Sequence, residues 1–118
     1  MKRVLLLAIV GLGLTASSAV MAQVDLMGTP TYGTFTLTSG FTPDPATYAV
    51  TAGGPVASGT LTTAEGSPCS AGWIASTPDV RIHYDSPAGF PLRFYVDTAG
   101  TDPTLAINSP DGQWHCVD

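Results

Sequence analysis

Basic residues are almost absent from this chain. Of its four lysines and arginines, Lys2 and Arg3 stand at the start, and only Arg81 and Arg93 occur later. Contacts from Lys and Arg to phosphates dominate the affinity of proteins for nucleic acids, so a nucleic-acid-binding function is excluded. Binding to an anionic membrane surface is disfavoured for the same reason.

Long hydrophobic runs are also scarce. The one such run extends from Val4 to Leu14, which is too short to span a bilayer, and no stop-transfer pattern follows it. It lies between the basic start and a stretch of small residues that ends at Ala22, which is the three-part pattern of a secretory signal peptide. We therefore expect a signal helix over residues 1–22 and cleavage between Ala22 and Gln23. The product is expected to be periplasmic or secreted, with no stable membrane anchor.

Residues 23–118 are predicted to form a single domain. This part of the chain has two arginines against nine acidic residues, a formal charge of −7. A domain of this length buries only about 60–65% of the surface that its unfolded chain exposes. Its core is therefore expected to be small and to need additional support.

The two cysteines, Cys69 and Cys116, are the expected support. An even number of cysteines in an exported chain indicates a disulfide. The alternative is a pair of free buried thiols. A metal site is disfavoured, because His83 and His115 lie at no recognised ligand spacing from the cysteines.

Helical periodicity is absent after residue 22, and short alternating runs separated by Gly and Pro replace it. The pattern predicts strands over Thr31–Thr38, Thr47–Thr51, Gly59–Thr62, Val80–Asp85, Leu92–Asp97, Thr104–Asn108 and a last one around Trp114 and Cys116. The first two are expected to form a hairpin. Such spacing predicts an all-β fold, a small antiparallel β-sandwich of jelly-roll type.

Side-chain placement follows from the same alternation. Leu92, Phe94 and Val96 are expected to face inward, and Trp73 is expected to cover one end of the core. On the outer face, Arg81 and Arg93 could pair with acidic residues of neighbouring strands, an interaction of about 0–1 kcal/mol.

Several segments resemble exported bacterial proteins of the pre-peptidase C-terminal domain family. The resemblance covers most of residues 23–118 and rests on Cys69 with Ile74–Asp79 and on Pro78–Arg81, Pro91–Val96 and Asn108–Cys116. It implies a small β-sandwich that accompanies secreted hydrolases. Some members carry a trypsin-like serine peptidase label, which implies no activity for this chain.

The resemblance has one departure. In the family, the Trp-x-Cys segment continues into an acidic loop and further strands that close the sandwich, whereas this chain ends at Asp118. We expect either a truncated chain, the interpretation that we favour, or a short member with an open sheet edge. An exposed edge invites strand pairing with another chain.

Catalytic signatures are missing. Ser67, Ser70, His83 and His115 supply groups for a catalytic triad, but no Gly-x-Ser-x-Gly or Gly-Asp-Ser-Gly-Gly motif surrounds a serine. We therefore expect no catalytic residues, although the sequence alone leaves the question of an enzyme open. No cofactor is expected. Calcium is the one alternative, because acidic residues lie in or beside predicted loops at Asp97, Asp102, Asp111 and Asp118.

A binding role is the favoured interpretation. Tyr95, between Arg93 and Asp97, is expected on the polar side of its strand, so Tyr95 and Arg93 are the candidate surface contacts for a protein or glycan partner. The sequence thus predicts an exported, non-catalytic accessory or interaction domain. The alternative is a fragment or associated domain of a secreted, serine peptidase-like hydrolase.

Overall fold

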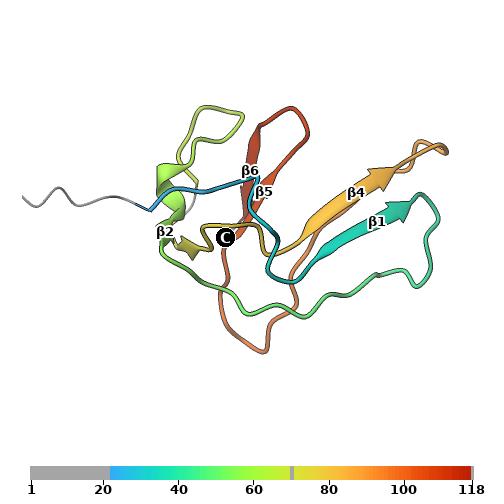
Figure 1. The fold of residues 1–118 in the computed structure, drawn as a ribbon, viewed down its shortest axis with the longest axis horizontal. Helices are drawn as coiled ribbons and strands as arrows, with labels where there is room; N and C mark the ends of the chain where they lie inside the picture. Colours follow the sequence, from blue (N-terminus) through green and yellow to red (C-terminus); the bar gives the residue numbers. More distant parts are fainter. Residues whose placement is uncertain (1–21, 70, 118) are drawn as a thin grey trace, which may run out of the picture.

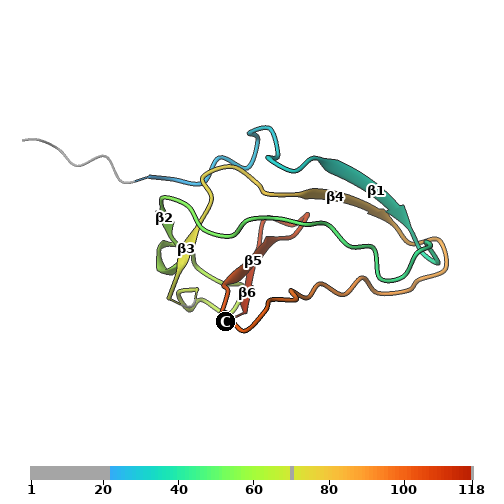
Figure 2. The ribbon, with the colours of Figure 1, turned by 90° about the horizontal axis from the view of Figure 1, so that it is seen from below.

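A computed structural model describes residues 22–69 and 71–117 of the chain. The regular structure in these residues is β, apart from one short 3-10 helix, and they contain no helix with the length and hydropathy to cross a membrane. The elements are β1 (Thr34–Thr38), β2 (Val56–Ala57), η1 (Ser58–Thr60), β3 (Trp73–Ile74), β4 (Arg81–Asp85), β5 (Leu105–Asn108) and β6 (Trp114–Val117). The strands form three separate pairs, with β2–β3 at one end of the molecule, β1–β4 at the other and β5–β6 between them (Figures 1 and 2).

Strands β1 and β4 are parallel, and their register places apolar residues side by side. Phe35 pairs with Ile82 and Leu37 pairs with Tyr84. These four residues are half-buried, whereas the threonines that alternate with them in β1 are exposed. The predicted strands are therefore confirmed over Thr34–Thr38 and Arg81–Asp85. The expected antiparallel arrangement is wrong for this pair, which is parallel.

The segment before β1 is fastened to β4 by hydrogen bonds. The Arg81 guanidinium donates to the carbonyl oxygens of Leu26, at 2.7 Å, and Gly28, at 3.1 Å. The amide of Tyr32 donates to the carbonyl of Asp79 at 2.8 Å. Arg81 thus binds the backbone instead of the acidic partner that the sequence suggested.

The hydrophobic core is very small. Among the described residues, Val56 and Cys69 are the buried hydrophobic side chains, with Ser58 beside them at 0% exposure. The Ser58 amide and hydroxyl both approach the carbonyl of Gly72, at 3.0 and 3.1 Å. This core holds β2, η1 and β3 together.

The β5–β6 hairpin is antiparallel and is closed by a tight turn. Ser109 donates its amide to Gln113 at 2.9 Å, and the amide of Gly112, whose φ is 81°, donates to Ser109 at 2.8 Å. A disulfide joins Cys116 of β6 to Cys69, with the Cα atoms 5.5 Å apart. The predicted final two strands and the predicted disulfide are confirmed.

The fold is mostly β, as expected, but no sandwich is present in the described part of the chain. A sandwich requires two sheets packed face to face over a shared core. Here each sheet has two strands. Two-stranded pairs bury too little apolar surface to form such a core.

The expected hairpin between Thr31–Thr38 and Thr47–Thr51 is wrong, because β1 pairs with β4 and residues 47–51 form no strand. Side chains hold the latter segment instead. The ring of Tyr48 stacks on Phe35 with centroids 3.9 Å apart, and the amide of Thr51 donates to the Tyr32 hydroxyl at 3.0 Å.

Three further predictions are wrong. Part of the predicted strand Gly59–Thr62 belongs to η1, where the Thr60 hydroxyl donates to Ala57 and closes the helical turn. Trp73 is 63% exposed instead of covering the core. The run Leu92–Asp97 forms no strand, because its backbone has no neighbouring strand with which to pair.

Candidate binding groove

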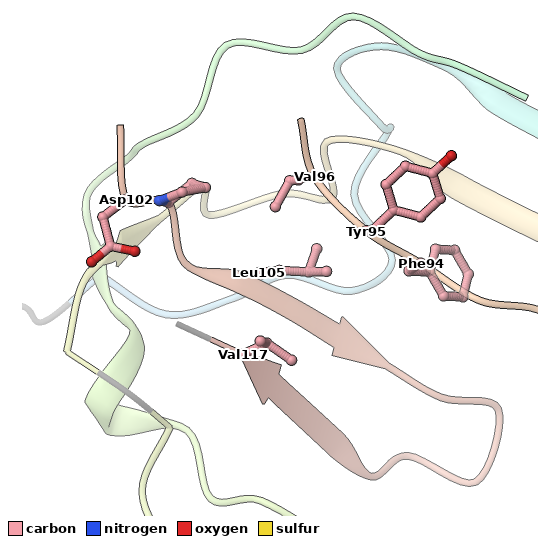
Figure 3. Close-up of a pocket in the computed structure, with 7 residues that line it drawn as sticks. Phe94, Tyr95, Val96, Asp102, Leu105 and Val117 are labelled. Carbon is pink, nitrogen blue, oxygen red and sulfur yellow. The ribbon is translucent and has the colours of Figure 1, made fainter. Parts of the chain in front are cut away.

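An apolar groove lies between the β5–β6 hairpin and the segment that crosses over it. Its volume is about 290 Å³. Figure 3 shows Leu105 and Val117 on the two neighbouring strands, with the crossing segment above them. The lining residues are Phe94, Tyr95, Val96, Asp102, Pro103, Leu105 and Val117.

The hairpin fixes the floor of the groove. Leu105 and Val117 are directly opposite each other in the register of β5 and β6. Because side chains alternate across a strand, Val117 points to the opposite face from Cys116, which is bonded to Cys69. The disulfide therefore anchors one face of β6 and leaves Val117 on the other, where it is 62% exposed.

The wall of the groove consists of large apolar side chains that remain in water. Phe94 is 43% exposed, Tyr95 62% and Val96 47%. The expected inward placement of Phe94 and Val96 is therefore wrong. A contiguous exposed apolar patch of this kind marks an interaction site more often than a solitary exposed hydrophobic residue does.

The backbone of this wall is also unpaired. No amide or carbonyl of residues 91–97 takes part in a hydrogen bond with the part of the chain that the structure describes. Buried backbone groups are nearly always paired, so such a segment must face water or a partner. Both its side chains and its backbone are available for binding.

One carboxylate stands at the end of the groove. Asp102 lines it just before β5, and Figure 3 places its side chain at the margin of the apolar surface. Neither Asp97 nor Arg93 forms an ion pair with any other described residue, so the cross-strand pairing that the sequence suggested for Arg93 is absent. The groove thus combines an apolar surface with an acidic end.

A second group of polar residues lies at the β5–β6 turn. The Ser109 hydroxyl is 3.2 Å from Nε2 of His115 and donates to the Asp111 carboxylate. Asp111 also accepts the amide of Gln113 at 3.1 Å. A serine beside a histidine is the first requirement of a catalytic triad.

The Ser109 hydroxyl has a single proton, and three acceptors lie within reach of it. The Asp111 carboxylate and the Gln113 carbonyl, at 3.1 Å, therefore compete with Nε2 of His115 for the proton that a general base must accept. The hydrogen bond from Ser109 lowers the pKa of Asp111, with smaller contributions from the Gln113 amide and His115. The group is exposed and has the pattern of a side-chain-stabilised turn.

The remaining predicted site residues do not form a cluster among the described residues. His83 is exposed on β4 opposite Thr36, and Ser67 belongs to the turn near Thr63. Ser70 and Asp118 lie outside the described residues. In the described part of the chain, no three His, Cys, Asp or Glu side chains form a group suited to a metal ion.

The predicted cleavage site lies beside another hollow, of about 400 Å³. Ala22 and Gln23 line it together with Leu61 and Trp114, and both Ala22 and Gln23 are exposed. Residues 1–21 of the predicted signal lie outside the described residues.

Comparisons with known proteins give no further constraint. The chain matches no protein-family model, no curated protein and no solved structure. The sequence pattern indicated Tyr95 and Arg93 as surface contacts but not Leu105 and Val117, because alternation alone does not reveal which sheet face lacks a cover.

Proposed function

We propose that this chain is an exported, non-catalytic binding domain, and that the groove beneath Phe94, Tyr95 and Val96 is its ligand-binding surface. The observation that carries the proposal is the exposure of these side chains above Leu105 and Val117. Aromatic residues that bury apolar area dominate binding energies at interfaces. A partner that covers these side chains removes their apolar area from water, and this burial stabilises the complex.

The proposal also covers the compartment in which the domain works and the architecture of the domain. The signal pattern of residues 1–22 and the Cys69–Cys116 disulfide both support an oxidising compartment outside the cytoplasm. We propose a domain of the pre-peptidase C-terminal type, in which the three strand pairs become layers of a sandwich when a strand of the partner covers the groove. The resemblance of Pro91–Val96 and Asn108–Cys116 to that family supports this architecture.

The partner is proposed to be a protein, and an association with a secreted hydrolase is the second candidate. The contact between Ser109 and His115 is the observation that favours a hydrolytic role. The Asp111 carboxylate and the Gln113 carbonyl compete with the histidine for the Ser109 proton, which supports a non-catalytic role for this chain. The hydrolase would therefore be either the partner of this chain or a larger protein of which this chain is one domain.

Selection from a display library of random linear peptides on the whole chain tests the binding role. Enriched peptides are expected to lose binding to Tyr95→Ala and to keep binding to Trp73→Ala. Trp73 is the matched control, because it is 63% exposed against 62% for Tyr95 but does not line the groove.

Two results would overturn the proposal. One is a library with no enriched binder. The other is a set of binders that depend on Trp73 and not on Tyr95, which would place the binding surface at β3. Loss of an esterase activity in Ser109→Ala, if the purified chain has such an activity, would overturn the non-catalytic role.

A further inference from the structure

We infer that the groove accepts an extended, apolar strand that carries a basic residue, and that this strand pairs with residues 91–97. The inference rests on the proposed binding function and specifies the partner. Residues 91–97, which form the wall of the groove, have the composition of a strand but pair with no other strand in the described part of the chain. Phe94, Tyr95 and Val96 are among the residues most enriched in strands, yet the segment forms no ladder.

The unpaired backbone is the first argument. Residues 91–97 make no backbone hydrogen bond in the described part of the chain. An added strand would supply those bonds, as in recognition by β-augmentation, where the main chain provides affinity and alternate side chains provide specificity. A globular or helical ligand would leave these amides and carbonyls without partners once it excluded water.

The position of the apolar side chains is the second argument. The side chains of an added strand alternate between its two faces. One set would enter the groove against Leu105 and Val117, and the other set would face solvent. This arrangement requires apolar residues at every second position of the partner, and not a continuous apolar run.

Charge is the third argument, and it indicates that the partner strand carries a positive charge near Asp102. Asp102 lines the groove without a cationic partner among the described residues, and residues 23–118 carry a formal charge of −7. A second copy of this chain would bring two strongly acidic molecules together. A strand with Lys or Arg near Asp102 meets complementary charge instead, which favours encounter and fixes the register.

A synthetic peptide that alternates valine with threonine and ends in lysine is the probe. A peptide of reversed sequence covers the other strand direction. Binding to the whole chain is measured by NMR titration, and the expected chemical-shift changes are at Phe94, Tyr95, Val96, Leu105 and Val117. Tyr95→Ala is expected to weaken binding, whereas Trp73→Ala is the control with unchanged affinity.

N-methylation of the peptide tests strand pairing. In a strand, alternate amides face the neighbouring strand. Methylation of one alternate set should weaken binding by at least about tenfold, since several hydrogen bonds are lost. The other set is the matched control and should retain binding. Equal tolerance of both sets, with the shifts still in the groove, would overturn strand pairing and leave the proposed binding function intact.

A charge exchange tests the basic residue. Replacing the peptide lysine with glutamate should weaken binding by about two- to fivefold, the range for an exposed ion pair. Asp102→Lys should reverse this preference, and Asp97→Lys measures the effect of changing the net charge alone. An unchanged preference in Asp102→Lys would overturn the assignment of the basic residue to this end of the groove.

Two remaining outcomes separate the inference from the proposed function. Concentration-dependent dimers that Tyr95→Ala abolishes would show that the occupant is a second copy, which overturns the choice of a basic partner. In the other outcome, all alternating peptides fail to bind while the display selection yields binders that contain proline at every second position and still require Tyr95. That result would overturn strand pairing and leave the groove as the proposed binding surface. Failure of both the peptides and the display selection would overturn the proposed function itself.

Discussion

Leu105 and Val117 lie opposite each other in the β5–β6 hairpin, and both line the groove. The neighbour of Val117, Cys116, is bonded to Cys69 on the opposite face of the strand. The floor of the groove is therefore adjacent to the one covalent link of the chain. This arrangement links the stability of the domain to the shape of the groove.

Loss of the disulfide should unfold the chain. The Cys69→Ser and Cys116→Ser variants each open a loop whose ends are 47 residues apart in sequence, for which the chain-entropy model gives about 4 kcal/mol. Since Val56 and Cys69 are the buried hydrophobic residues of the described chain, little other stabilisation remains. Circular dichroism should show loss of structure, and the double variant should resemble the single ones. A native-like spectrum for Cys116→Ser would contradict this prediction.

The stacked pair Phe35–Tyr48 should contribute measurably to stability. Its ring centroids are 3.9 Å apart, and such pairs stabilise by about 0.5–1.5 kcal/mol beyond the area that they bury. Urea unfolding of Tyr48→Ala is therefore expected to show a loss of at least about 1 kcal/mol. Tyr95→Ala is the control, with a change within about 0.5 kcal/mol for an exposed side chain. Equal losses in the two variants would show that the stack contributes nothing particular.

Gly54 should not tolerate a side chain. A Cβ atom at this position would meet the backbone of Ile74 and Ala75, with the Ala75 Cα 2.5 Å away. Overpacking of this kind costs about 1–3 kcal/mol. Gly54→Ala should therefore lower the thermal midpoint, whereas Gly59→Ala should not, because the nearest atom to its Cβ is 3.9 Å away. A midpoint that is unchanged in Gly54→Ala would mean that the 54–55 and 74–75 segments do not lie together.

Asp79 gives the fold a defined dependence on pH. Partial burial raises the pKa of its carboxyl above the usual value. The folded chain therefore favours the protonated carboxyl more than the unfolded chain does. Stability from this group is complete below the pKa of the unfolded chain and falls as pH rises through the higher pKa of the folded chain. Asp79→Asn should therefore be more stable than the parent at neutral pH and equal to it at acidic pH. A stabilisation that is independent of pH would contradict this assignment.

Local sequence pattern predicted β1 and β4 because each is an alternating run with its polar residues outward. It predicted β5 and β6 from short runs bounded by turn residues, although β5 is half-buried throughout and Val117 of β6 is exposed. The same rule failed for Leu92–Asp97, because a strand forms only beside a neighbour and alternation does not identify that neighbour. It failed for Thr47–Thr51 because Tyr48 and Thr51 are held by side-chain contacts with Phe35 and Tyr32. Such long-range contacts have no local signature.

The candidate site was predictable only in part. Tyr95 was singled out as a surface contact from its place between Arg93 and Asp97. Its neighbours in the groove, Phe94, Leu105 and Val117, were not. Phe94 and Val117 are exposed and Leu105 is half-buried because no layer of the described chain covers this face of β5 and β6, which alternation does not reveal. The Ser109–His115 contact follows from the turn geometry, which brings residues six positions apart to 3.2 Å.

Amide hydrogen exchange of residues 92–97, the part of the 91–97 segment that carries amide hydrogens, tests the central claim most directly. In the whole chain alone, these amides should exchange as fast as those of an unstructured peptide, since no described residue pairs with them. Addition of the alternating lysine peptide should protect every second amide and leave those between them fast. Strong protection of residues 91–97 in the chain alone would show that this segment is already paired, and would contradict the claim that it awaits a partner strand.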